Sequence, residues 1–262
     1  MTAPTAIQSQ TALDELAAQA ESTAVALTGK LDAAIPYCPG WTGRDLACHL
    51  AGVYRWASTV VAERLERPPG PEERAALFAD PDPGDDAGVL RRLREGSELI
   101  VGSLRAAPGD LECWTIWPAG QPREFWIRRQ LHETVVHRVD AANAGRAQAD
   151  AATGADLPAD LAVDGIDEMV LGFCSRYSRN LRRAEPAGLA LESSDTGDRW
   201  WIRIGSEGPV GGRGIAADPA RTTVRGRCGE LLLLLWNRRS TADLEIGGEA
   251  DLLAEWRTNG KL

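Results

Sequence analysis

Glu133 and His137 stand four residues apart, a spacing that lets two side chains on one helix bind the same metal ion. Each helical residue turns by about 100°, so a spacing of four brings both side chains within about 40° on one face. The chain has three histidines, and one of the other two, His49, belongs to a separate predicted helix. Two imidazoles and one carboxylate are typical of catalytic zinc, which has three protein ligands and an open position. We therefore predict a divalent metal site at His49, Glu133 and His137.

A simpler interpretation is that Glu133 and His137 form an ordinary exposed helix pair, which contributes only a few tenths of a kcal/mol. The same predicted helix face carries four further residues: Trp126, Gln130, Asp140 and Ala144. This mixture of apolar and ionisable groups fits neither a solvated face nor a plain core face. His132 lies about 140° from His137 around the helix. We predict that His132 stays outside the metal site.

Two charged neighbours of the pair each have two interpretations. Asp140 follows His137 by one turn and could accept the second imidazole proton, which would fix the tautomer; it could equally be a surface carboxylate. Arg129 lies close to the Glu133 face and could bind an anionic substrate or thiol. Its alternative role is that of a solvated arginine.

The composition describes a soluble acidic protein. The chain has 262 residues, 44% hydrophobic and 26% charged, and a net charge of -9. An acidic chain without a basic cluster argues against nucleic-acid binding. We expect no membrane span, because no stretch of 18 apolar residues exists. The first 30 residues are polar and have no basic residue before Lys30, so we expect no secretory signal.

Cysteine usage indicates a reducing compartment. The five cysteines are odd in number and scattered, with no CxxC pair, which suits reduced thiols in the cytoplasm. Cys48 adjoins His49, but consecutive helix residues point about 100° apart. We predict that Cys48 is a buried small side chain. We expect a cytoplasmic monomer or homodimer.

Residues 1–150 have the pattern of a four-helix bundle. Apolar residues at helical spacing predict helices over 8–33, 42–67, 86–106 and 122–145. Thr42 and Asp45 form a capping-box signal at the start of the second helix. Residues 68–88 are crowded with Pro, Gly and Asp, which predicts a long loop with a short turn at 72–78. Four amphipathic helices joined in this way predict an antiparallel bundle, whose core can host a metal site.

Residues 151–262 predict a smaller mixed domain after an Ala-, Asp- and Gly-rich linker at 146–158. A helix at 158–182 precedes strand-like runs at 188–192, 199–204, 222–227 and 244–246, and a final helix covers 249–257. The run from Leu231 to Trp236 is interpreted as a buried helix, with a buried strand as the alternative, because periodicity cannot decide a short apolar run. Strands and helices together predict an α+β or α/β domain.

Several segments resemble the mycothiol-dependent maleylpyruvate isomerase family: residues 41–50, 132–141, 161–168 and 229–238. The resemblance implies a DinB-like four-helix bundle over 1–150 and a sterol-carrier-like α/β domain over 151–262. In that family a divalent metal, usually zinc, is held by a histidine of the second helix and by a Glu and a His four apart on the fourth. The matching residues are His49, Glu133 and His137. No residue of 68–88 can be matched.

The resemblance also implies mycothiol as the thiol cosubstrate. A thiol bound to a divalent cation is deprotonated, and the thiolate can attack an electrophilic, anionic small molecule. Addition to a conjugated double bond, rotation and expulsion would give isomerisation, whereas displacement of a leaving group would give S-transfer. Arg238 matches a recurrent arginine of the family and could reach an active site; its alternative role is a cation at a helix C-terminus. Two other classes stay open, a non-catalytic ligand-binding protein and a hydrolase that uses metal-activated water.

Overall fold

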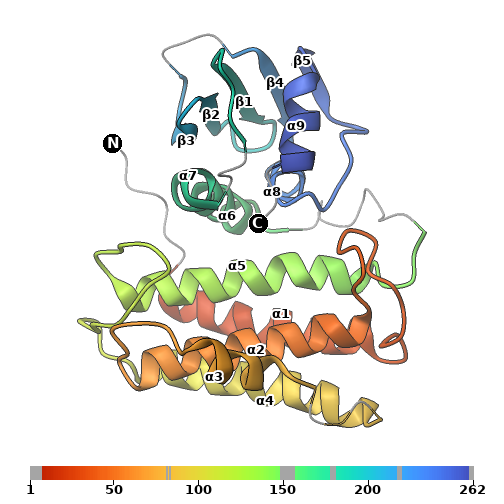
Figure 1. Cartoon of the computed structure of the whole chain (residues 1–262), viewed down its shortest axis with the longest axis vertical. Coiled ribbons are helices and arrows are strands. Elements are labelled where there is room, and N and C mark those ends of the chain that lie inside the picture. Colours follow the sequence, from red (N-terminus) through yellow and green to blue (C-terminus); the bar gives the residue numbers. More distant parts are fainter. Residues whose placement is uncertain are drawn as a thin grey trace. The chain divides into compact units, whose positions relative to one another are not determined.

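The computed structural model describes residues 8–80, 82, 84–147, 157–177, 181–216 and 220–259. These residues fall into two compact units, one within Ile7–Asp150 and the other within Ala151–Leu262 (Figure 1). Most of the linker predicted at 146–158 lies outside the described residues, which exclude 148–156. No described helix is long and apolar enough to span a membrane.

The described part of the first unit forms a helical bundle. Its helices are α1 (Ser9–Leu27), α2 (Gly43–Ala62), α3 (Pro71–Phe78), α4 (Asp86–Ala106) and α5 (Pro122–Ala142). The four long helices lie side by side, with α2 packed on α4 and α1 packed on α5 (Figure 1). Each buries an apolar stripe, as α1 does with Leu13, Leu16 and Leu27. The predicted four-helix bundle is confirmed, although α1, α2 and α5 are shorter than predicted.

The start of α2 is fixed by the predicted capping box. The Thr42 side-chain oxygen accepts a hydrogen bond from the Asp45 backbone N–H at 3.3 Å, and the Asp45 carboxylate accepts one from the Thr42 backbone N–H at 2.8 Å. These bonds satisfy two backbone donors that have no partner inside the helix. The cap therefore fixes the first turn of α2, two turns before His49.

The short helix α3 corrects the prediction of a long loop with a turn at 72–78. Pro71 occupies the first turn, where its missing N–H costs nothing. Glu73 caps this end by accepting a hydrogen bond from the Gly70 backbone N–H at 2.9 Å. No α3 residue is fully buried, so its sequence lacks the apolar periodicity that would predict a helix. The Phe78 ring packs against α2 at Gly52, where a Cβ would lie 2.6 Å from the ring.

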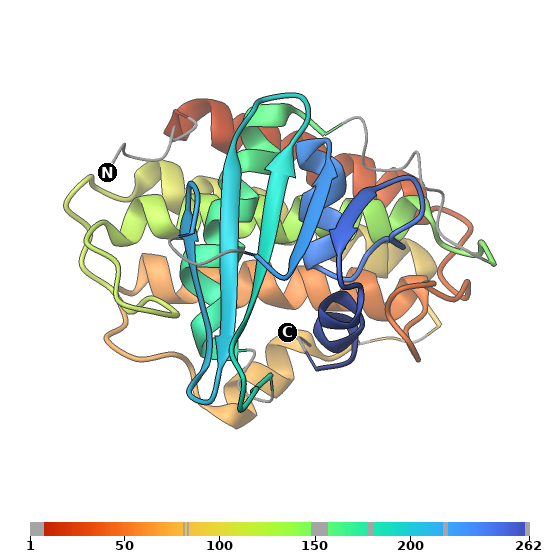
Figure 2. The ribbon, with the colours of Figure 1, turned by 90° about the horizontal axis from the view of Figure 1, so that it is seen from above.

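The second unit carries a five-stranded sheet in the order β3-β2-β1-β4-β5 (Figure 2). The strands are β1 (Ala187–Ser193), β2 (Arg199–Gly205), β3 (Gly208–Arg213), β4 (Thr222–Gly226) and β5 (Glu245–Gly248). The β1–β4 pair is parallel and the other pairs are antiparallel. β3 was not predicted, because its glycines conceal the strand pattern. A side chain would not fit at Gly212, because a Cβ there would lie 2.6 Å from the Trp201 side chain.

Helices precede the first strand, separate β4 from β5 and follow the last strand in the sequence. The predicted helix at 158–182 consists of α6 (Ala159–Asp167), the π-helical segment η1 (Glu168–Phe173) and α7 (Cys174–Tyr177), and residues 178–180 lie outside the described residues. The leucine run belongs to α8 (Cys228–Leu235), so the predicted buried helix is confirmed and the strand alternative is wrong. All five leucines are buried, and α8 packs on α6. The last helix is α9 (Asp251–Asn259). A helical N-terminal domain with a C-terminal α/β domain is thus confirmed.

Candidate metal centre

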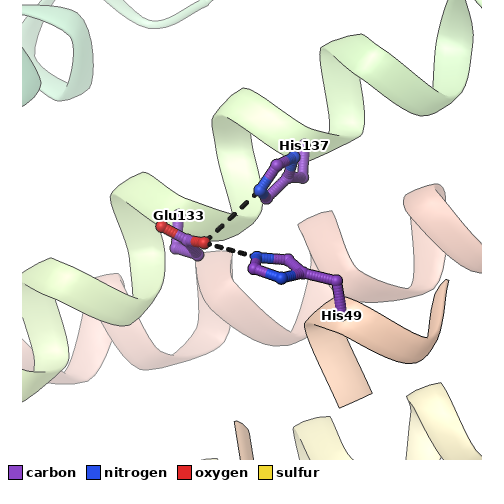
Figure 3. Close-up of side chains that lie close together, drawn as sticks. All are labelled: His49, Glu133 and His137. Atoms are coloured by element: carbon purple, nitrogen blue, oxygen red, sulfur yellow. Dashed lines mark hydrogen bonds and ion pairs between the residues drawn. The ribbon is translucent and has the colours of Figure 1, made fainter. Parts of the chain in front are cut away.

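His49, Glu133 and His137 converge on one point between α2 and α5. His49 Nε2 lies 3.0 Å from Glu133 Oε1, and His137 Nε2 lies 3.3 Å from the same oxygen. One ligand atom from each residue lies within 4.8 Å of the others. Figure 3 shows the three side chains pointing toward one another, His49 from one helix and the other two from the facing helix. The structure therefore brings together all three residues that the spacing selected.

The antiparallel arrangement of α2 and α5 produces this meeting. His49, near the start of α2, contacts residues in the second half of α5, whereas Trp56, later in α2, contacts Trp126 early in α5 with ring centroids 5.4 Å apart. The spacing of four aligns Glu133 and His137 on the α5 face that points at α2. The cluster lies at a partly open edge of the bundle, because the His49 and Glu133 side chains are 24% and 16% exposed.

Asp140 orients the His137 ring. The Asp140 carboxylate lies 2.8 Å from His137 Nδ1, and the Cys38 thiol donates to the same carboxylate oxygen at 3.4 Å. Asp140 is buried. A carboxylate beside Nδ1 favours a proton on that nitrogen and leaves Nε2 as the nitrogen that faces Glu133 and His49. Of its two predicted roles, the contact with the imidazole is the one that Asp140 has here.

Arg129 occupies the other side of Glu133. Its guanidinium forms an ion pair with Glu133 Oε2, and the arginine is buried. The two carboxylate oxygens therefore have different neighbours, since Oε1 faces both imidazoles and Oε2 faces Arg129. This geometry leaves one oxygen of Glu133 directed at the position where a cation would bind.

Burial and charge shape the protonation of the cluster. Burial alone would raise the pKa of Glu133, but Arg129 and the two histidines outweigh it and hold this pKa well below its usual range. Burial would lower the pKa of His137, but Asp140 and Glu133 raise it. For His49, burial prevails over Glu133 and lowers the pKa. Glu133 is thus anionic and His49 neutral at neutral pH, which are the forms that bind cations.

Aromatic rings cover the two imidazoles. The Trp41 ring lies 4.9 Å from the His49 ring and 6.1 Å from the His137 ring, and the Phe78 ring lies 5.8 Å from His49. The sequence reasoning did not select either residue for the site. Trp41 directly precedes the N-cap, a position where apolar residues often pack onto the following helix, so a signal for it existed. Phe78 lay in the predicted loop and had no such signal.

The other candidates lie apart from the three ligand atoms. His132 is buried and outside the cluster, and Cys48 is buried as predicted, with its pKa raised by burial. Arg238 belongs to the second unit. It follows α8, and its guanidinium donates a hydrogen bond to the Trp236 carbonyl at 2.9 Å.

The donor set fits a divalent cation of the zinc type. Two imidazole nitrogens and one carboxylate oxygen are borderline donors that suit zinc and its neighbours. The separations of 3.0 and 3.3 Å from Glu133 Oε1 match the distance of about 3–4 Å between two ligands of one zinc, whose metal–ligand bonds are about 2.0–2.2 Å. The remaining separation, at most 4.8 Å, would close slightly around one ion. Three protein ligands would leave coordination positions for small molecules.

Two family models match consecutive parts of the chain. The model described as the mycothiol maleylpyruvate isomerase N-terminal domain matches residues 10–142, and the MDMPI C-terminal domain model matches residues 160–255. The chain belongs to the mycothiol maleylpyruvate isomerase family. The predicted resemblance is therefore confirmed over nearly the whole chain, and the family is one of enzymes. A comparison with curated proteins finds no match.

Solved structures related to the mycothiol maleylpyruvate isomerase family share this fold. A crystal structure of the mycothiol-dependent maleylpyruvate isomerase matches with a TM-score of 0.68 at 16% identity, covering 95% of this chain and 97% of that chain. A histidine-to-alanine mutant of that enzyme matches with a TM-score of 0.66 at 15% identity, with the same coverage of both chains. At such identities the likeness concerns the fold alone.

Proposed function

We propose that this chain is a metal-dependent enzyme that uses mycothiol to act on an electrophilic, anionic small molecule, as a maleylpyruvate isomerase does. The observation that carries the proposal is the convergence of His49, Glu133 and His137, which bring one ligand atom each to within 4.8 Å of the others. Membership of the mycothiol maleylpyruvate isomerase family supports the thiol and the reaction class. Zinc is the metal that best suits this donor set.

Each residue of the site has a role in this proposal. A divalent cation bound there supplies a positive charge that favours the thiolate form of a thiol. His49, Glu133 and His137 hold that charge in place, and Asp140 keeps the Nδ1 proton of His137 so that Nε2 faces the site. Trp41 limits the access of water to the imidazoles. We assign Arg129 and Arg238 to the binding of negatively charged groups. Arg129 does so through its ion pair with Glu133.

The proposed reaction is a reversible addition. The thiolate of mycothiol adds to one carbon of a conjugated cis double bond, and the electron pair of that bond moves onto the conjugated carbonyl. Rotation about the resulting single bond and return of the electron pair expel the thiolate and give the trans isomer. Thiol and proton are both recovered, so no oxidant or reductant is consumed. No chemical step requires a nucleophile from the protein, and the five free cysteines are buried or half-buried.

An isomerisation assay tests the proposal. Purified protein, assayed for metal content, is incubated with maleylpyruvate in the presence and absence of mycothiol, and the cis and trans isomers are quantified. We expect conversion only with mycothiol and no net loss of the thiol. Thiol consumption with other electrophiles would identify an S-transferase instead. Product formation with water alone would identify a hydrolase, and ligand binding without turnover would overturn the enzymatic proposal.

The metal assignment has a test of its own. The single substitutions His49→Ala, Glu133→Ala and His137→Ala each remove one ligand and should reduce bound metal by at least about 10-fold, because two remaining donors hold a cation poorly. His132→Ala is the matched control, since His132 neighbours Glu133 on α5 but lies outside the cluster. Elemental analysis of dialysed protein gives the stoichiometry. Equal metal content in all four variants would remove the assignment.

A further inference from the structure

Helix α3 carries an exposed arginine, Arg74. Arg74 forms no ion pair with the part of the chain that the structure describes, whereas Arg44 pairs with Asp80 at 3.0 Å and Arg129 pairs with Glu133. The neighbouring acid on α3, Glu73, is directed to the helix N-terminus, where it accepts the Gly70 hydrogen bond. Arg74 therefore offers its full set of donors to a ligand.

Two ring contacts in series connect Arg74 with the metal centre. The guanidinium carbon lies 5.1 Å from the centroid of the Phe78 ring, and the Phe78 ring lies 5.8 Å from the His49 ring. A guanidinium stacked on an aromatic face keeps its N–H groups free around the edge of its plane. The Phe78 ring thus lies between the Arg74 guanidinium and the partly exposed imidazole of His49.

Contacts at the C-terminal end of α3 hold this arginine in place. The Leu77 carbonyl accepts a hydrogen bond from the Arg92 guanidinium at 2.9 Å. The Phe78 ring lies directly on Gly52, which leaves no room for a Cβ. Arg74 is one turn before these anchors, so it is presented from a fixed helix.

Arg74 adds positive charge near the metal centre, because the Phe78 ring contacts both its guanidinium and the His49 ring. A positive charge at that position attracts an anion held beside His49. An anionic electrophile next to the metal ligands would occupy this field.

We propose that Arg74 binds a carboxylate of the substrate and thereby selects carboxylate-bearing electrophiles over neutral ones. That the bound carboxylate belongs to a substrate rests on the proposed function. A planar guanidinium can hold a carboxylate through two parallel hydrogen bonds, which fixes both distance and orientation. Arg74 is then a specificity residue, contributed by a segment in which the sequence marks no site.

Binding of maleate, a dicarboxylate that needs no thiol, tests the proposal by isothermal titration calorimetry on the metal-assayed protein. Arg74→Gln should weaken maleate binding about 10- to 100-fold, the range for a charge-assisted hydrogen-bonded pair. Arg74→Lys should lose less, because it keeps the charge but not the planar fork. Arg67→Gln is the matched control, since Arg67 is also exposed and unpaired among the described residues, and should bind like the wild type. Maleamide, the neutral analogue, should not distinguish wild type from Arg74→Gln.

Equal maleate affinity in wild type and Arg74→Gln overturns the proposal, and so does a wild type that binds no maleate. These outcomes are distinct from a failure of the proposed function. Arg74-dependent maleate binding without any reaction of mycothiol would contradict only the reaction. Mycothiol-dependent isomerisation with an unchanged KM in Arg74→Gln would contradict only the role of Arg74.

Discussion

The candidate ligand residues are held in place by neighbours that lie outside the cluster of ligand atoms. His137 is oriented by Asp140 through Nδ1 at 2.8 Å, and Glu133 is held by Arg129 through Oε2. Such outer contacts matter because a rotating imidazole or carboxylate must be re-ordered each time a cation binds. The buried Arg129 also offsets one of the two negative charges, so the metal-free cluster is tolerated inside the bundle.

Replacing Asp140 with Asn tests this support. The amide preserves the shape but removes the negative charge that keeps the proton on His137 Nδ1, so we expect metal affinity to fall about 10- to 100-fold. Asp110→Asn is the matched control, because Asp110 is exposed in the same unit. Competition with a chromophoric chelator measures both dissociation constants. An Asp140→Asn variant with wild-type affinity would show that His137 needs no partner.

Helical periodicity predicted the long helices of the first unit and placed Glu133 and His137 on one helix face. A spacing of four fixes the relation of Glu133 to His137 wherever the helix lies, and the capping signal at Thr42 placed the start of α2 before His49. The same reasoning could not predict α3 or its ring contact, because a helix without a fully buried residue has no apolar stripe. It also missed β3, since glycines that admit neighbouring side chains have no strand propensity.

The contact between the Phe78 ring and Gly52 gives a prediction for α3. Gly52→Ala would place a Cβ 2.6 Å from the ring, an overlap that costs about 1–3 kcal/mol unless Phe78 moves. Alanine has a higher helix propensity than glycine, by about 1 kcal/mol, so we expect α2 to remain helical. Phe78 should then move away from α2 and take α3 with it. A glutamyl endopeptidase should then cleave faster after Glu72 or Glu73.

Gly102→Ala is the control for this substitution, because a Cβ at Gly102 in α4 meets nothing within 4 Å. It should raise stability by the same helix-propensity gain, about 1 kcal/mol, without changing cleavage in α3. Chemical denaturation gives the two stabilities. Unchanged cleavage in Gly52→Ala would show that the ring contact does not anchor α3.

At the scale of the whole molecule, the three candidate metal ligands all come from the unit within Ile7–Asp150. We propose that a boundary at 150/151 separates this metal-binding domain from the α/β domain. The second unit contains Arg238, in the turn that ends α8. The backbone N–H of Asn237 bonds to the Leu234 carbonyl and that of Arg238 to the Leu233 carbonyl, with Asn237 at a φ of 58°. This Schellman turn satisfies the last carbonyls of α8 through the backbone, so the Arg238 side chain is not required to end the helix.

Arg238→Ala should therefore separate catalysis from folding. The variant loses the hydrogen bond to the Trp236 carbonyl but keeps the backbone turn that ends α8, so we expect the protein to stay folded and its metal content to stay at the wild-type value. We expect kcat/KM for isomerisation to fall at least about 10-fold, the loss of one charge-assisted contact to an anion.

The neighbouring Arg239 provides the contrast, because it is buried and pairs with Glu230 at 2.8 Å. Arg239→Ala should destabilise the protein by about 3–5 kcal/mol. If Arg238→Ala keeps its fold, its metal content and the wild-type kcat/KM, Arg238 has no role in the reaction.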